Sequence, residues 1–246
     1  MKVKSILAAL LLMVAGYQTV LAQKVVLHKT NGQTIEHEYV DLGLPSGTLW
    51  ATCNIGANSP EEYGDYFAWG ETSGYNGGKT CFNWETYKYT LTYHELDGTV
   101  KKYCTKSSAS GVVDNKTELE PEDDAATVNW GSEWQMPSNA QLEELVNSSY
   151  TTTSWTTLNG VSGRMIISKS NGKRIFLPAA GFRLGITYIA DGEYGGCWSR
   201  SLYEANSEDS HLLFFSSSNI ITGYYYRVHG YSVRPVRVKK IRVPLR

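Results

Sequence analysis

The carboxylates near the middle of the sequence are the first side chains that could do chemistry. They are Glu120, Glu122, Asp123 and Asp124. Calcium takes about six to eight oxygen ligands in proteins, so these groups could hold a structural calcium ion. Acidic residues at the start of a helix are explained equally well by the helix dipole. The sequence leaves both interpretations open, and calcium is the one cofactor that it suggests.

The cysteines could form disulfides or act as reactive thiols. They are Cys53, Cys81, Cys104 and Cys197. Their wide spacing contains no CxxC pair, which argues against a zinc site. Several disulfide pairings are open, and the sequence does not choose among them. Because Cys81 and Cys104 flank an insertion-like segment, we favour a bridge between these two.

The familiar catalytic motifs are missing from the sequence. It contains no nucleophile elbow, HExxH motif, P-loop or dinucleotide-binding fingerprint. The five histidines are scattered without the spacing of metal ligands. The sequence therefore predicts a protein that is not an enzyme.

A tyrosine-rich segment fills the last quarter of the chain. It begins with a glycine-rich stretch at residues 195–201 and closes at residues 230–236. Between them lie the polar residues 216–219 and the tyrosines 224–226. Tyrosine offers rigid contact area at low entropic cost, and Ser, Gly and Asn offer adaptable hydrogen bonds, so this composition is typical of a recognition surface. The alternative is a hydrated antiparallel strand whose rings pack against a neighbouring strand.

The first 22 residues predict export. Lys2 and Lys4 precede an apolar stretch over residues 6–15, and small residues follow before Gln23. This pattern is typical of a secretory signal peptide and is too short for a membrane span. We therefore expect an exported protein without a membrane span, located in the periplasm, at the cell surface or outside the cell.

The length and net charge of the chain indicate its domain number and argue against one kind of partner. The chain has 246 residues and a formal net charge of −1. Without the signal peptide it is long enough for one large domain with an extensive core. The near-neutral balance gives no support to nucleic-acid binding. Acidic residues gather at 114–124 and basic ones at 227–246, and such charge blocks are usually solvated faces.

Two hairpins are expected from their turn sequences. Residues 25–30 and 33–39 flank Asn31-Gly32, and residues 165–170 and 173–177 flank Asn171-Gly172. Asn-Gly tolerates the positive φ angles of a type I′ turn, so each pair predicts two antiparallel strands.

Two helices are also expected. Ser138 and Gln141 form a capping box before an apolar face made by Leu142 and Leu145. A shorter helix is predicted around residues 122–128, with acidic residues at its N-terminus. Residues 75–114 show little strand regularity, which predicts a long loop region or insertion.

A series of motifs carries a resemblance to a known family. They are residues 39–47, 50–57, 63–71, 123–126, 130–131 with 134–138, 176–181, 197–199 and 232–236. In this order they resemble the Fibrobacter succinogenes major paralogous domain family, which is common in exported proteins of Bacteroidetes-type bacteria. The resemblance covers residues 39–238.

The resemblance implies a C-type-lectin-like fold of the formylglycine-generating-enzyme type. Such a fold is α+β, with short antiparallel strands, one or two helices and many loops. We therefore divide the chain into a signal peptide (1–22), an N-terminal hairpin segment (23–38), the lectin-like domain (39–238) and a basic tail (239–246). The tryptophans within the motifs are expected in the core, except Trp198, which borders the tyrosine-rich segment.

Some members of this group are targets of diversity-generating retroelements, which rewrite residues on the ligand-facing surface before the closing Ser-Val-Arg-Pro-Val. That implies a ligand-binding surface in the last quarter of this chain. Its predicted residues are Trp198, Tyr203, Asn206, Ser207, Asp209, Ser210, His211, Thr222, Gly223, Tyr224, Tyr225, Tyr226, His229 and Tyr231.

The sequence thus predicts an exported, non-enzymatic binding module. A glycan, a peptide or a cell-surface protein would suit such a surface as ligand. One alternative is a structural or assembly component of the cell envelope. A second is a thiol-dependent oxidoreductase, because relatives of the implied fold use paired cysteines; Cys53 and Cys197 would be the pair here.

Overall fold

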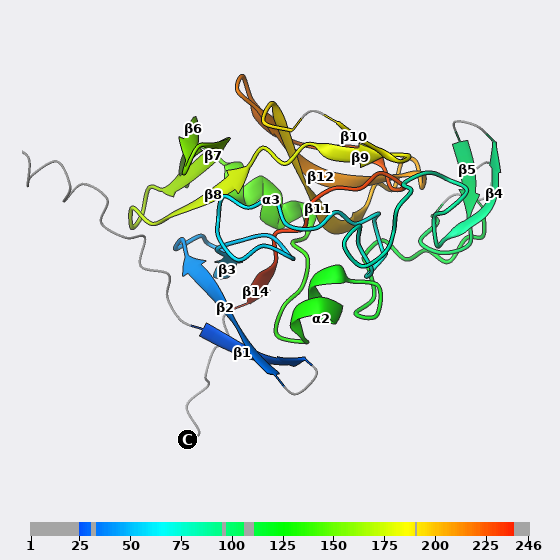
Figure 1. Ribbon diagram of the computed structural model, residues 1–246, viewed down its shortest axis with the longest axis horizontal. Helices are drawn as coiled ribbons and strands as arrows, with labels where there is room; N and C mark the ends of the chain where they lie inside the picture. Colours follow the sequence, from blue (N-terminus) through cyan, green and yellow to red (C-terminus); the bar gives the residue numbers. More distant parts are fainter. Residues whose placement is uncertain (1–24, 31–32, 95–96, 106–110, 190, 239–246) are drawn as a thin grey trace, which may run out of the picture.

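The computed structural model describes residues 25–30, 33–94, 97–105, 111–189 and 191–238. Over these ranges the chain consists mostly of short strands in small antiparallel sheets, with two helices (Figure 1). The predicted α+β class is confirmed at this level. The predicted signal peptide, the Asn31-Gly32 turn and the basic tail lie outside the described residues.

The first sheet brings the two ends of the described chain together. Its strands follow the order β1-β2-β3-β14. The predicted first hairpin is confirmed, because β1 pairs antiparallel with β2 and Thr30 lies opposite Gln33. β14 then pairs with β3, which places Val236 opposite Trp50. The bounds are β1 Val25–Thr30, β2 Gln33–Asp41, β3 Thr48–Ala51 and β14 Val236–Val238.

The second sheet contains the second predicted hairpin. β7 pairs antiparallel with β8, as expected, but β7 ends at Ser168 and the connecting turn is longer than two residues. The Ser168 hydroxyl donates to the Leu42 carbonyl (2.6 Å), and the side-chain amide of Asn171 donates to the Asp41 carbonyl (3.0 Å). The turn is therefore fixed against the first sheet. The bounds are β6 Thr151–Leu158, β7 Val161–Ser168 and β8 Arg174–Pro178.

The third sheet holds the tyrosine-rich segment. Its order is β11-β12-β13, so the strand with the three consecutive tyrosines lies at an edge (Figure 1). Two strand pairs complete the described β-structure. The bounds are β11 Tyr194–Leu202, β12 Asp209–Ser216, β13 Ile220–Tyr226, β9 Phe182–Leu184, β10 Thr187–Ile189, β4 Thr90–His94 and β5 Asp97–Val100.

The helices follow the capping signals. Helix α3 (Asn139–Val146) has the predicted capping box between Ser138 and Gln141. Helix α2 (Ala125–Trp130) starts later than predicted, because Asp124 is its N-cap and accepts a hydrogen bond from the Thr127 amide. The acids before Asp124 therefore precede the helix rather than forming its first turn.

The segment at 75–114 is not a simple loop insertion. It carries the short β4–β5 pair, and Phe82, Trp84, Tyr87 and Tyr89 are all buried in one hydrophobic cluster. Aromatic side chains bury large areas, so irregular backbone can still contribute to a core. Four tryptophans of the family-like motifs are buried as predicted: Trp50, Trp69, Trp130 and Trp134.

Candidate functional site

The glycine-rich start of β11 is a close-packed scaffold. A Cβ atom on Gly195 would lie 2.1 Å from the ring of Phe215, and one on Gly196 would lie 2.4 Å from the ring of Tyr231. Trp198 is fully buried, and its Nε1 donates to the Phe67 carbonyl (2.8 Å). The prediction that Trp198 contacts ligand is therefore wrong, because a buried, hydrogen-bonded indole presents no surface.

The closing motif is held by a buried arginine. The Nε of Arg234 donates to the Asn54 side chain (2.9 Å), and Nη1 donates to the carbonyls of Ala51 (3.1 Å) and Thr52 (2.7 Å). Its Nη2 donates to the Phe176 carbonyl (3.0 Å). The guanidinium thus ties the end of the domain to two other segments, and it is not part of a solvated basic face.

A second buried arginine anchors the end of β13. The Nε of Arg227 donates to the Tyr87 hydroxyl (2.7 Å), and Nη1 donates to the carbonyls of Tyr103 (3.1 Å) and Ser207 (2.9 Å). Nη2 donates to the Lys102 carbonyl (3.2 Å). Sequence reasoning missed this role and placed Arg227 in the solvated basic block. The position of Arg227 directly after three tyrosines was the sequence signal that could have indicated this role.

The tyrosines at the end of β13 form the exposed part of the segment. Tyr224, Tyr225 and Tyr226 are 51%, 44% and 39% exposed. Tyr224 stacks on Tyr203, with ring centroids 3.8 Å apart and planes within 5°. His211 lies opposite Tyr224 in the strand register and contacts the edge of Tyr203. Tyr203, His211 and Tyr224 therefore form one face, called here the Tyr224 face.

Tyr225 points to the other side of the strand, because successive side chains alternate. Its ring lies 6.3 Å from Phe182 and 5.0 Å from His229, measured between centroids. Gly223 lies on the same side, and nothing comes within 4 Å of the position of its missing Cβ. On this Tyr225 face, the space left by the missing side chain of Gly223 therefore lies open beside an exposed ring. The single predicted surface is in fact divided between two faces of an edge strand.

Several predicted contact residues belong to the scaffold instead. They are Ser207, Asp209, Ser210, His229 and Tyr231, all of which are buried. The Ser207 hydroxyl accepts from the Thr105 amide (3.2 Å), and Asp209 accepts from the Asn206 side chain (2.9 Å). Burial lowers the pKa of His229 to about 4, so this imidazole is neutral at physiological pH. Asn206, Thr222 and Gly223 keep partial exposure at the margin of the tyrosines.

The four predicted calcium ligands do not all lie in one cluster. Glu120, Glu122 and Asp123 have carboxylate oxygens within 4.8 Å of one another. Asp124 is separate, since it caps α2 and accepts from the Met136 amide (2.8 Å). Three of the four predicted residues are therefore brought together, and the fourth has a structural role.

A lysine already fills the acidic cluster. The Nζ of Lys102 lies 2.6 Å from Glu120 and 2.5 Å from Asp123. Burial alone would raise the pKa of Asp123, but hydrogen bonds from Lys102, Lys88 and Tyr103 hold it well below its usual range. An ammonium group supplies the positive charge that a cation would otherwise bring, so the arrangement functions as an ion-pair network as it stands.

The cysteines are all within the described residues, and each is a thiol rather than half of a disulfide. The favoured Cys81–Cys104 bridge is therefore not formed. Cys104 is buried with its amide held by Asp114 (2.9 Å), whereas Cys81 is only half-buried. Burial raises the pKa of Cys197 to about 11 and also raises that of Cys53. Neither thiol is suited to form the thiolate that redox chemistry needs.

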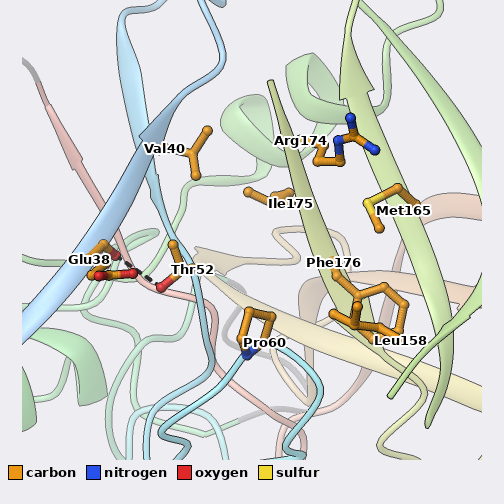
Figure 2. Close-up of a pocket in the computed structure, with 9 residues that line it drawn as sticks. All are labelled: Glu38, Val40, Thr52, Pro60, Leu158, Met165, Arg174, Ile175 and Phe176. Atoms are coloured by element: carbon orange, nitrogen blue, oxygen red, sulfur yellow. Dashed lines mark hydrogen bonds between the residues drawn. The ribbon is translucent and has the colours of Figure 1, made fainter. Parts of the chain in front are cut away.

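The structure also has cavities away from the tyrosines of β13. One, of about 170 Å³, opens between β2 and β8, and Figure 2 shows Val40, Ile175 and Phe176 among the side chains around it. Another, of about 390 Å³, is polar and borders the serines of the β12–β13 turn, with Trp155 and Tyr194 in its wall. Sequence reasoning identified neither of these, because each forms between segments distant in the chain.

Comparisons of this chain with protein-family models, with curated proteins and with solved structures gave no match. Among the described residues, no helix has the length and apolar character needed to cross a membrane.

Proposed function

We propose that this protein is an exported, non-enzymatic ligand-binding module with a C-type-lectin-like fold. It would be a relative of the Fibrobacter succinogenes major paralogous domain proteins and would use the tyrosines of β13 to bind. The observation that carries the proposal is the contrast at this edge strand. Three consecutive tyrosines are exposed, while Arg227 directly after them is fully buried and each of its nitrogens donates to a protein oxygen.

Physical reasoning favours recognition for this arrangement. Exposed aromatic rings gathered in one place mark interaction sites in soluble proteins. The Tyr203–Tyr224 stack holds its rings before any ligand arrives, which reduces the entropy lost on binding. Tyrosine also combines an apolar ring with a hydroxyl, so it suits a glycan, a peptide or a cell-surface protein. These are the ligand classes that we propose. The proposal includes neither nucleic-acid binding nor a membrane span.

The raised pKa values of Cys53 and Cys197 support a protein without thiol catalysis. The proposal likewise includes no cofactor, since Lys88, Lys102 and Lys116 already form ion pairs with the acidic cluster.

Replacement of the tyrosines tests the proposal. A glycan array and a panel of cell-surface peptides would first identify a ligand of the wild-type protein. Changing Tyr224, Tyr225 and Tyr226 together to alanine should then weaken binding by at least about tenfold, because tyrosines that a ligand covers are common hot spots. Tyr150→Ala is the matched control, since Tyr150 is similarly exposed (38%) but lies between α3 and β6.

Wild-type affinity in a correctly folded triple variant would refute the recognition surface. That result would favour the alternative of a structural component of the cell envelope, which uses the fold without the tyrosines.

A further inference from the structure

Arg183 is fixed in direction by its backbone. It lies in the middle of β9, opposite Tyr188 of β10. On its other side, its amide donates to the Gly230 carbonyl (2.8 Å) and its carbonyl accepts from the Gly230 amide (2.9 Å). Both edges of the backbone are therefore paired at this residue, so the side chain leaves the strand at a defined angle.

Three tyrosine rings surround the Arg183 guanidinium. Its Cζ lies 3.2 Å from the ring centroid of Tyr75, 5.2 Å from that of Tyr66 and 5.3 Å from that of Tyr188. The hydroxyls of Tyr66 and Tyr188 both donate to the Ala180 carbonyl, at 2.6 and 3.0 Å. These two rings are thus held in place themselves. A guanidinium against an aromatic face keeps its N–H edge available for planar hydrogen bonds.

The guanidinium has no hydrogen-bond acceptor among the described residues. The Nε is sealed from solvent without a partner, and no ion pair is formed with the side chain in the described part of the protein. Arg227 and Arg234 differ sharply, because every one of their nitrogens donates to a protein oxygen. Buried polar groups in folded proteins normally have partners. Because the Nε is enclosed, a ligand would reach the two terminal nitrogens, which have no acceptor among the described residues either.

We propose that Arg183 is the anchor of a binding site for a carboxylate group. The guanidinium fork matches the two oxygens of a carboxylate and binds them in a bidentate manner. Among the described residues, Arg183 is the single cation over these three rings, so a monoanion balances the charge better than a dianionic phosphate. The partly exposed Tyr75 ring would contact the part of the ligand next to its carboxylate.

The site stands independently of the tyrosines of β13. Phe182, the preceding residue, lies on the side of Tyr225, with ring centroids 6.3 Å apart. Because successive side chains of a strand alternate, Arg183 leaves β9 on the opposite side. The Arg183 site requires only the contacts of β9, β10 and Tyr75.

Nuclear magnetic resonance of the ¹⁵N-labelled protein tests the site directly through the arginine Nε–Hε signals. D-glucuronate and acetate are the carboxylate probes, inorganic phosphate is the dianion, and D-glucose is the neutral match for glucuronate. We expect a saturable shift of the Arg183 signal with both carboxylates, a weaker response to phosphate and none with glucose. A signal that does not move with either carboxylate would refute the proposal, as would an equal shift with glucose.

Variants identify the fork as the binding element. Arg183→Lys keeps the charge but loses the bidentate geometry, and should weaken glucuronate binding by at least about tenfold. Arg174→Gln removes an exposed arginine on β8 and should leave the titration unchanged. Wild-type glucuronate affinity in Arg183→Lys would overturn the assignment. The titration of the wild-type protein decides even where a variant folds poorly, and Tyr224→Ala addresses the tyrosines of β13 separately.

Discussion

The glycines of the last quarter have opposite roles at the scale of single residues. Gly195 and Gly196 lack a side chain because neighbouring rings occupy the space, whereas Gly223 lacks one beside open solvent. The same residue type therefore supports the core at one end of the segment and shapes the surface at the other. Composition alone could not distinguish these roles, since both depend on what other segments place nearby.

Gly195→Ala is expected to destabilise the protein. The added methyl group would meet the Phe215 ring at 2.1 Å, and such overpacking typically costs about 1–3 kcal/mol. Gly223→Ala, in the same sheet, has free space and should be neutral or stabilising by up to about 1 kcal/mol. Urea unfolding of the three proteins compares them. Equal midpoints for the two variants would contradict the difference in environment.

His229 is expected to make stability fall in mildly acidic solution. Its pKa is about 4 in the folded protein because of burial, while an unfolded histidine has a pKa of about 6.5. The unfolded state therefore binds the proton first, and stability that is complete above about pH 6.5 is lost as the pH falls towards 4. The loss reaches about 3 kcal/mol.

Urea unfolding between pH 7 and pH 4 measures this dependence, with His229→Gln as the control. The variant should show a shallower slope, because the remaining pH dependence comes from other groups. Parallel curves for the two proteins would mean that His229 is not the group responsible.

At the scale of secondary-structure elements, local signals predicted the fold best. The capping box of α3 and the strand pairs of the two hairpins were predicted correctly because each depends on residues close together in sequence. The two-residue turn predicted at Asn171-Gly172 was wrong, since β7 ends at Ser168 and β8 begins at Arg174. The predicted start of α2 was too early. Glu120 and Asp123 form ion pairs with Lys88, Lys102 and Lys116 and lie before the helix. The division of the tyrosines between two faces follows from strand alternation, but only once the strand and its partners are known.

The N-cap of α2 gives a prediction at this scale. Asp124→Ala removes the acceptor of the Thr127 and Met136 amides and should cost about 2 kcal/mol, because a buried cap is lost. Glu122→Ala, two residues earlier and exposed, should change stability little. Thermal unfolding of both variants makes the comparison. A larger loss for Glu122→Ala would show that the acidic cluster, and not the cap, stabilises this region.

At the scale of the whole molecule, the protein achieves its stability without cross-links. Two hydrophobic clusters run through it, and the larger one takes in residues from the 75–114 segment. The sequence suggested a disulfide there because exported proteins often have them. Buried aromatic side chains supply the stabilisation instead, which could not be read from cysteine spacing.

The reactivity of the cysteine thiols tests whether the protein lacks disulfides. In urea, the protein prepared without reductant should react with a thiol reagent at all four cysteines. In the native state, half-buried Cys53 and Cys81 should react well before buried Cys104 and Cys197. A reductant should also leave the thermal midpoint unchanged. Only two reactive thiols in urea would establish a disulfide.

The Arg227 anchor has a consequence for any attempt to shorten the protein. Three of the four oxygens around its guanidinium come from Tyr87, Lys102 and Tyr103, all within the 75–114 segment, and the fourth is the Ser207 carbonyl. The sequence predicts a loop region or insertion for this segment, which makes it an obvious target for deletion. Its deletion would leave a charged group in the interior with a single acceptor, directly after the strand that carries the exposed tyrosines. A minimal version of this domain must therefore retain the segment, or replace Arg227 at the same time.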